Sequence, residues 1–413
     1  MEAALPMPHE TAELPGPVAQ PNAMGVPAHD SFWSRLPQPI IGLSPMDGVT
    51  DAAFRLVVAR QGPPDVMFTE FTGVGDLCRG PDHVLTSLLY GEDERPVVAQ
   101  LYGKDPDLFY VAAHAVCELG FDGLDINMGC PSRSVASSGS GAGLIRTPAL
   151  AHAIMRAARQ GILDWAGGQT PEAAGLRPAR ADLIRTMNLR RNGSPGPRRR
   201  IIPLSVKTRL GYGSVVIEEW VTHLLEERPV ALSVHGRTLE QMYRGRADWT
   251  AIERAARLAR QTDTLLLGNG DLQSLSDVVD RLRETSVHGV LVGRGALGRP
   301  WFFERKETMR AVASGRAGGS RHDGELGEVL AEGADDLLRR FTVMLEHARL
   351  FEALYGVERF PHLRKHLGWY CKGFREAAAM RAEMVRASSS GDVERIVAEH
   401  LAMKPLVPCL DRG

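Results

Sequence analysis

The chain lacks the cysteine pattern of a metal-binding or disulfide-rich protein. Its 413 residues include five cysteines, and none of them forms a CxxC pair or another metal-ligand spacing. Scattered cysteines of this kind are typical of free thiols in a reducing compartment. We therefore expect a cytoplasmic protein that binds no metal.

Long apolar runs and an excess of one charge are also absent. No stretch reaches the roughly 18 apolar residues that a membrane-spanning helix needs, and residues 1–37 lack the apolar core of a signal peptide. The formal net charge is -1, which excludes a generally basic coat for nucleic acid. Any polyanion must therefore meet a local patch. We expect a monomer with no membrane partner.

Short β-branched runs alternate with helical patterns from Pro39 onward, and residues 1–36, rich in proline, alanine and glycine, are predicted to be a disordered tail. Parallel strands need crossover helices, so eight such units predict one closed α/β fold, a (β/α)8 TIM barrel over residues 37–312. The predicted strands are 40–44, 66–70, 96–101, 123–127, 201–207, 230–235, 264–269 and 289–293.

The alternation is interrupted between the fourth and fifth predicted strands. Residues 164–200 are rich in glycine, proline and arginine, with eight arginines against three acidic residues. An insertion at this point is expected at the end of the barrel where strands begin. A long loop inside a compact domain is usually either disordered or functional. Two interpretations stay open: a solvated, disordered insert, or an accessory arm that contacts RNA phosphates.

A second domain follows the barrel. Residues 328–405 show leucine, phenylalanine and alanine at three- and four-residue spacing, which predicts a helical bundle. Within it, residues 361–386 carry six basic against two acidic residues, with Trp369 and Tyr370 among them. A basic stripe with aromatics suits contact with RNA. A solvated helix face whose aromatics point into the bundle explains the same pattern.

The stretch 123–133, GLDINMGCPSR, is the strongest local signal. A short apolar run ends at Asn127, and Gly129-Cys130-Pro131 forces a tight exit that holds the thiol at the end of a strand. Barrel enzymes assemble their sites at the carboxyl ends of the strands. Cys130 is therefore either a buried structural cysteine or, given its neighbours, a catalytic thiol.

Polar or glycine residues follow seven of the eight predicted strands. Any one of them is weak evidence, because a lone lysine or histidine is more often structural. Their common register with the strands is stronger evidence for one ligand site at that face of the barrel. These residues are Pro45, Met46, Asp47, Gln100, Asn127, Cys130, Lys207, Arg209, His235, Arg237, Asn269, Gly270, Asp271, Gly293, Arg294 and Gly295.

Glycine-rich turns follow the seventh and eighth strands, and with Arg294 and a following helix they form the usual phosphate site of this fold. A phosphate site beside amide and cationic groups suggests a flat phosphorylated cofactor, and FMN fits. Gln100 is placed to hydrogen-bond the pyrimidine edge of the flavin, and Lys207 to stabilise negative charge on reduction. No GxGxxG motif follows a strand at the start of a βαβ unit, so a nicotinamide donor would visit only transiently.

Ten motifs, in this order, resemble the tRNA-dihydrouridine synthase family. The resemblance spans about residues 39–386 and implies an FMN-containing barrel, a C-terminal helical domain that helps to hold tRNA, and NADPH as electron donor. The motifs are LSPMDGVTD, FTEF, VAQLYG, GLDINMGCPSRSV, GAGLIRTP, SVKTRLGY, SVHGRT, GNGD, GVLVGRGALGRPW and RKHLGWYCKGF.

The resemblance also implies roles for individual residues. Cys130 is similar to the family's catalytic acid, and Asn127 and Tyr243 are candidates for contact with the substrate base. The residues that look like FMN contacts are Pro45, Met46, Asp47, Gln100, Lys207, His235, Asn269, Gly270, Asp271, Gly293 and Arg294.

The implied reaction is reduction of a specific uridine in the tRNA D-loop to 5,6-dihydrouridine. Reduced FMN gives a hydride to carbon 6 of uracil, and Cys130 gives a proton to carbon 5 from the other face. A thiol with a reference pKa of about 8.5 stays mostly protonated near neutrality, which suits a general acid. Nucleophilic catalysis by a Cys/His pair is the rival role. A base inside folded tRNA must flip out to reach the flavin.

Two other functions stay open. One is an FMN barrel dehydrogenase acting on a free pyrimidine, against which the basic helical domain argues. The other is an RNA-binding protein on a degenerate barrel, against which the intact Cys130 and Lys207 argue. The stretch HGRTLEQMYRGRADW is most similar to the bacterial branch acting on the 5′ side of the D-loop, the C branch. RKHLGWYCKGF resembles other branches, so the position of the uridine is open.

Overall fold

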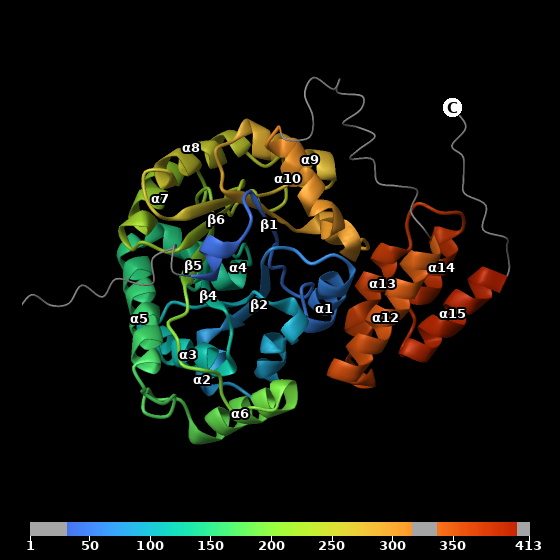
Figure 1. Ribbon diagram of the computed structural model, residues 1–413, viewed down its shortest axis with the longest axis horizontal. Coiled ribbons are helices and arrows are strands. Elements are labelled where there is room, and N and C mark those ends of the chain that lie inside the picture. The colour runs from blue at the N-terminus through green and yellow to red at the C-terminus, as the bar shows by residue number, and fades with distance from the viewer. Residues whose placement is uncertain (1–30, 316–336, 403–413) are drawn as a thin grey trace, which may run out of the picture.

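The computed structural model describes residues 31–315 and 337–402. Eight strands pair in parallel in the order β1-β8-β7-β6-β5-β4-β3-β2. The sheet closes on itself through two backbone hydrogen bonds of 3.0 Å, from Leu43 to Val66 and from Asp65 to Ile41. The predicted TIM barrel is therefore confirmed (Figure 1). The strands are β1 (Ile40–Leu43), β2 (Met67–Gly73), β3 (Val97–Tyr102), β4 (Gly123–Met128), β5 (Leu204–Arg209), β6 (Ala231–His235), β7 (Leu265–Asn269) and β8 (Gly289–Val292).

Local sequence sets the helix boundaries around the barrel. At the start of α3, Asp105 accepts the amides of Asp107 and Leu108 at 3.0 and 3.3 Å, with Pro106 in the first turn. Gly120, at φ +81°, ends the helix. The helices up to residue 315 are α1 (Ala52–Gln61), α2 (Val74–Arg79), α3 (Pro106–Leu119), α4 (Arg133–Ser137), α5 (Pro148–Ala166), α6 (Pro178–Asn192), α7 (Ile217–Glu226), α8 (Trp249–Ala259), α9 (Leu275–Glu284) and α10 (Lys306–Ala313).

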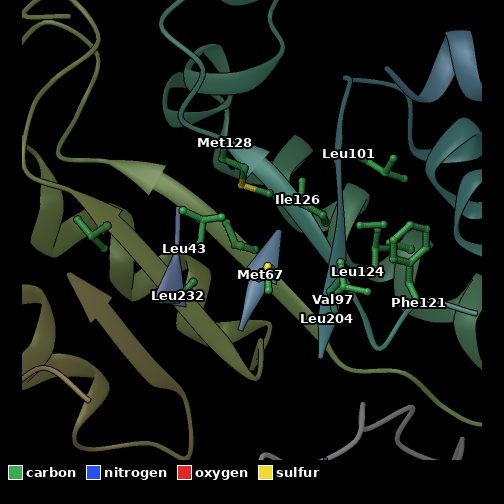
Figure 2. Packing of buried hydrophobic residues seen from close by; sticks show 14 of the residues in the cluster. Leu43, Met67, Val97, Leu101, Phe121, Leu124, Ile126, Met128, Leu204 and Leu232 are labelled. Atoms are coloured by element: carbon green, nitrogen blue, oxygen red, sulfur yellow. The ribbon is translucent and has the colours of Figure 1, made fainter. Parts of the chain in front are cut away.

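Side chains alternate between the two faces of each strand. In β4, Leu124, Ile126 and Met128 belong to the core that packs the strands against the helices (Figure 2). The intervening Asp125 and Asn127 face the inside of the barrel, because successive side chains of a strand point to opposite faces. One short sequence thus supplies both a core and a row of polar groups.

The N-terminal end of the barrel is filled by apolar side chains, including that of Trp33, which is buried and lies 6.4 Å from Phe68 between ring centroids. Trp33 belongs to a 3-10 helix, η2 (Phe32–Arg35), capped by Ser31. The prediction of a disordered tail is therefore wrong for residues 31–36, because a large aromatic side chain gains more from closing the barrel than from exposure to water. Residues 1–30 of that predicted tail lie outside the described residues.

The arginine-rich segment is not a structureless loop, so the interpretation as a disordered insert is wrong. Helix α5 extends to Ala166, and α6 spans Pro178–Asn192 within the segment (Figure 1). Helix α6 packs beside the end of α3, where Asn188 donates to the Glu118 carbonyl at 2.7 Å. The segment therefore lies beside the N-terminal ends of the strands, as expected.

Six of the eight arginines in this segment bind groups of the protein itself. Arg191 pairs with Glu92 at 2.9 Å, and its guanidinium lies 4.1 Å from the centre of the Tyr90 ring. These contacts tie α6 to the barrel and take up positive charge that an RNA arm would otherwise present. The six arginines are Arg177, Arg180, Arg185, Arg191, Arg199 and Arg200.

A helical domain packs against α1 on one side of the barrel (Figure 1). Its core includes Ala53 and Val57 of α1, so the two parts share apolar surface. Residues 328–336 and 403–405 of the predicted domain lie outside the described residues. No helix within residues 31–315 and 337–402 is long and apolar enough to cross a membrane. The helices are α12 (Leu337–Tyr355), η8 (Val357–Leu363), α13 (Arg364–Tyr370), α14 (Ala377–Met384) and α15 (Ser390–Ala402).

Candidate active site

A cavity of about 540 Å³ lies at the carboxyl ends of the strands. All fourteen residues that the sequence marked as catalytic, cofactor-binding or substrate-binding line it. Their shared position makes one site of them, although it does not by itself assign their roles. They are Pro45, Met46, Asp47, Gln100, Asn127, Cys130, Lys207, His235, Tyr243, Asn269, Gly270, Asp271, Gly293 and Arg294.

Strand register explains why these side chains meet. Asn127 of β4 lies opposite Lys207 of β5, and His235 of β6 lies opposite Asn269 of β7. Equivalent inward positions on neighbouring strands form layers across a barrel. The layers near the carboxyl ends are polar here, whereas those near Trp33 are apolar. A ligand therefore meets polar groups above a closed apolar floor.

The loop that carries Cys130 is held by Asn127. The side-chain oxygen of Asn127 accepts the amides of Gly129 and Cys130 at 3.0 and 2.8 Å. Gly129 passes close to β5, where a Cβ at this position would lie about 3.1 Å from the backbone of Thr208. These constraints hold the Cys130 thiol, whose residue is 5% exposed, at the cavity wall.

Burial raises the pKa of the Cys130 thiol. The nearby Asp47 carboxylate acts in the same direction, whereas Lys207 and Arg209 oppose it. The raised pKa keeps the sulfur protonated near neutral pH. This favours a proton donor over a thiolate nucleophile.

Lys207 and His235 lie side by side in the cavity wall, on neighbouring strands. Lys207 donates to the side-chain oxygen of Asn269 at 3.3 Å, and burial lowers its pKa to about 8. Burial and the neighbouring Arg209 and Lys207 charges lower the pKa of His235 well below its usual value, so the imidazole is neutral. Its buried Nδ1 has no hydrogen-bond partner within the described part of the chain. Such an atom is suited to a polar ligand.

The turns after β7 and β8 form a narrow cradle at one end of the cavity. Gly270 has φ +130°, and a Cβ there would lie 2.7 Å from Ala247. Asp271 binds two guanidinium groups, Arg237 at 2.7 Å and Arg294 at 3.1 Å. Arg294 is thus held at the cradle while half of its side chain stays exposed. The cradle suits an anion such as phosphate.

Tyr243 stands at the rim of the cavity, 63% exposed, with Arg294 5.7 Å from its ring centre. The loop that carries Tyr243 is held in place by hydrogen bonds from Arg209. Arg209 donates to the carbonyls of Thr238 and Met242 at 3.1 and 3.3 Å. The sequence marked Arg209 as a strand-end residue, and the structure adds a bracing contact to its place in the cavity wall.

Trp369 belongs to this site, although its sequence motif did not indicate that. Trp369 of α13 lines the cavity from the helical domain, close to Gly298, where a Cβ would collide with the Trp369 carbonyl. The adjacent Tyr370 is buried and lies 3.2 Å from the His347 ring nitrogen. The two aromatics of the basic stripe therefore differ: Tyr370 belongs to the bundle core and Trp369 to the site. The motif that contains both residues indicated that these aromatics mattered, but it did not show which ring points toward the cavity and which into the bundle.

A second cavity of about 360 Å³ lies where the barrel meets the helical domain. It combines acidic and basic side chains from both parts of the chain. Burial raises the pKa of Glu70 there to about 7. Its lining residues are Gly48, Asp51, Glu70, Thr86, Ser87, Phe351, Tyr355, Arg359, His362 and Lys365.

Comparison with known proteins places the chain among its relatives. It is 34% identical to a probable tRNA-dihydrouridine synthase 2 of Bacillus subtilis, over 89% of this chain and 96% of that protein. It is 30% identical to a probable tRNA-dihydrouridine synthase of Staphylococcus aureus, over 90% and 95% of the two chains. Among solved structures, DHODH of Eimeria tenella in complex with ferulenol has a TM-score of 0.44 and 13% identity, covering 66% of this chain and 83% of that one. A likeness this low supports no statement about activity.

A family model described as dihydrouridine synthase (Dus) matches residues 42–163 and 198–404. The unmatched stretch between them coincides with the arginine-rich segment that contains α6. The match covers both the barrel and the helical domain. The chain therefore belongs to the dihydrouridine synthase family.

Proposed function

We propose that this protein reduces a uridine of tRNA to 5,6-dihydrouridine, with FMN as cofactor and Cys130 as proton donor. The observation that carries the proposal is the position of the Cys130 thiol at the wall of a cavity whose other groups suit a flavin. Burial raises the pKa of this thiol, which favours its protonated form. Family membership and the two bacterial relatives support the substrate. Activity on the D-loop, NADPH as donor, a monomeric state and a cytoplasmic location stay predictions from the sequence.

The residues present fit FMN. The cradle formed by Gly270, Gly293 and Arg294 suits the phosphate, and the unpartnered Nδ1 of His235 suits a polar group of the cofactor. Lys207 supplies a positive charge in a buried place. When bound and reduced by NADPH, FMN supplies the hydride for carbon 6 of uracil.

The side chains of the cavity have separate tasks in this proposal. Lys207 stabilises negative charge on the pyrimidine edge of the flavin. Gln100 hydrogen-bonds the same edge. Cys130 gives its Sγ proton to carbon 5 of uracil, which its raised pKa permits because the acid form persists at neutral pH. The remaining residues implied as FMN contacts, Pro45, Met46, Asp47, Asn269 and Asp271, complete the wall.

The base and the rest of the tRNA need different surfaces. Asn127 and Tyr243 are the proposed contacts of the uracil, one buried in the wall and one exposed at the rim. Trp369 offers a further ring for stacking. The tRNA lies over the boundary between barrel and helical domain, where Arg359 and Lys365 line the second cavity. This arrangement lets a flipped uridine enter while the backbone stays outside.

Anaerobic flavin spectroscopy tests the proposal. The purified protein is loaded with FMN and reduced with NADPH, and its visible absorbance is followed after addition of tRNA that lacks dihydrouridine. Free uridine and uracil are added in parallel runs. We expect the oxidised-flavin band to return with tRNA only.

The other outcomes would refute the proposal. Reoxidation by the free pyrimidines would favour the metabolic dehydrogenase. A protein that binds tRNA and takes up no flavin would be an RNA-binding protein without turnover.

A further inference from the structure

A chain of buried hydrogen bonds joins the barrel interior to the Cys130 loop. Ser205 Oγ donates to Asp125 Oδ1 at 2.6 Å, and Gln100 Nε2 donates to Asp125 Oδ2 at 2.7 Å. Asn127 Nδ2 then donates to Gln100 Oε1 at 2.9 Å. Asn127 Oδ1 accepts the Cys130 amide at 2.8 Å. The chain crosses three neighbouring strands.

The direction of this chain follows from its two ends. Asp125 is fully buried, and its carboxylate accepts from both neighbours, so it requires the NH2 group of Gln100. With its NH2 group bound to Asp125, Gln100 directs its side-chain oxygen toward Asn127. Asn127 must therefore donate through its own NH2 group. The backbone amide of Cys130 requires the Asn127 oxygen from the opposite end. Both ends demand the same orientation of the two amides.

Strand register makes the chain possible. Gln100 lies opposite Asp125, and Asp125 lies opposite Ser205, so the three share one layer of the barrel. Asn127 is two residues after Asp125 and points to the same face. This layer lies at the bottom of the cavity. Gln100 and Asn127 line the cavity, whereas Asp125 and Ser205 do not.

We propose that Asp125 is a positioning residue, which sets the amide orientations of Gln100 and Asn127 and through them the place of the Cys130 thiol. This inference rests on the proposed function and deepens it. Asp125 is fully buried and does not line the cavity. Asp125 couples Gln100, which is expected at the edge of the flavin, to the loop that carries Cys130. One buried carboxylate thus sets the orientation of Gln100 and the position of that loop.

Two substitutions separate hydrogen-bond direction from charge. Asp125→Asn keeps an oxygen for Gln100 and gains an NH2 group that the Ser205 oxygen accepts, so the chain survives. Asp125→Leu keeps the branching at Cγ, although the side chain is larger, and it leaves the Gln100 NH2 group without an acceptor. Should Asp125→Leu not fold, as judged by flavin content and thermal unfolding, Asp125→Ala takes its place.

The direct measurement is the rate at which iodoacetamide alkylates Cys130, followed by mass spectrometry of the peptide that contains it. This readout needs no turnover. We expect alkylation at least threefold faster in Asp125→Leu than in the parent, and within a factor of two of the parent in Asp125→Asn. With tRNA as substrate, kcat should fall at least tenfold in Asp125→Leu while KM changes by less than twofold.

Two results would overturn the inference. One is unchanged alkylation in both Asp125→Leu and Asp125→Ala. The other is an Asp125→Asn variant as perturbed as Asp125→Leu, because charge rather than direction would then matter. Failure of the proposed function looks different: the parent would not be reoxidised by tRNA, whereas the alkylation difference between the variants would persist.

Discussion

The side-chain oxygen of Asn127 accepts the backbone amide of Cys130 at 2.8 Å. This contact joins the backbone of the Cys130 loop to β4, the strand that leads into the loop. The remaining NH2 group of Asn127 binds Gln100 through one hydrogen. Its second hydrogen is available to the cavity that Asn127 lines. Asn127 therefore combines support for the loop with the proposed contact to the uracil.

Replacing Cys130 with alanine should abolish most turnover and leave binding intact. The thiol is the proposed proton donor, and general acids contribute about 100-fold or more to rates. We expect kcat to fall by about that factor, with flavin content and tRNA affinity unchanged, as measured by absorbance and filter binding. Cys117→Ala, at another buried cysteine, serves as control. A fully active Cys130→Ala enzyme would remove the proposed acid.

Arg294→Ala should weaken the binding of FMN. Asp271 holds the Arg294 guanidinium at the glycine cradle, and a charged hydrogen bond to phosphate would be lost. We expect the dissociation constant for FMN, measured by quenching of flavin fluorescence, to rise about tenfold. Arg257→Ala on α8, whose side chain is largely exposed and pairs with Glu253, is the matched control. Equal affinity in the two variants would contradict the phosphate site.

Flavin reduction should slow above pH 8. Burial lowers the pKa of Lys207 to about 8, so the ammonium group is charged below this pH and loses its proton above it. Its positive charge then no longer stabilises the reduced flavin. Stopped-flow measurement of reduction by NADPH should show a decline with a midpoint near pH 8. In Lys207→Met, flavin reduction should be slower at neutral pH, and its rate should not decline further near pH 8. If the decline persists in Lys207→Met, it belongs to another group.

His347 should make the fold sensitive to acid. Burial lowers its pKa to about 3, so the folded protein keeps the ring neutral, whereas the unfolded chain takes up a proton below about pH 6.5. Above about pH 6.5, His347 therefore does not affect the free energy of unfolding. Below that pH, the free energy of unfolding falls by about 1.4 kcal/mol per pH unit because only the unfolded chain binds the proton. This slope should appear in the difference between parent and His347→Leu. The same pH dependence in parent and His347→Leu would contradict this origin of the slope.

The arginine-rich segment should support stability more than RNA binding. Arg191 pairs with Glu92 and covers Tyr90, with only a tenth of its side chain exposed. We expect Arg191→Ala to lower the free energy of unfolding by about 1 kcal/mol. Affinity for tRNA and its dependence on salt should stay the same. Arg190→Ala, at the exposed neighbour, should change neither quantity. A weaker salt dependence in Arg191→Ala would instead support the RNA arm.

Several features depended on contacts that sequence patterns do not contain. Trp33 looks like part of a proline-rich tail until its ring is seen to close the barrel floor. The arginines of 164–200 look solvated until their partners, such as Asp122 and Glu92, are known. Tyr370 and Trp369 are adjacent in one motif, and yet packing against α12 directs one inward and leaves the other at the cavity. In each case the deciding partner lies far away in the chain.

The sequence by itself determined the barrel, the family and fourteen of the residues that line the cavity, with Trp369 not among them. It could do so because strand alternation and strand ends are local patterns, and a closed parallel barrel brings all its carboxyl ends to one face. Only the tertiary structure decided how those residues are connected. The chain from Ser205 through Asp125 and Gln100 to Asn127 depends on the register between strands. Register is a property of the closed sheet, because it is set when distant segments pack together.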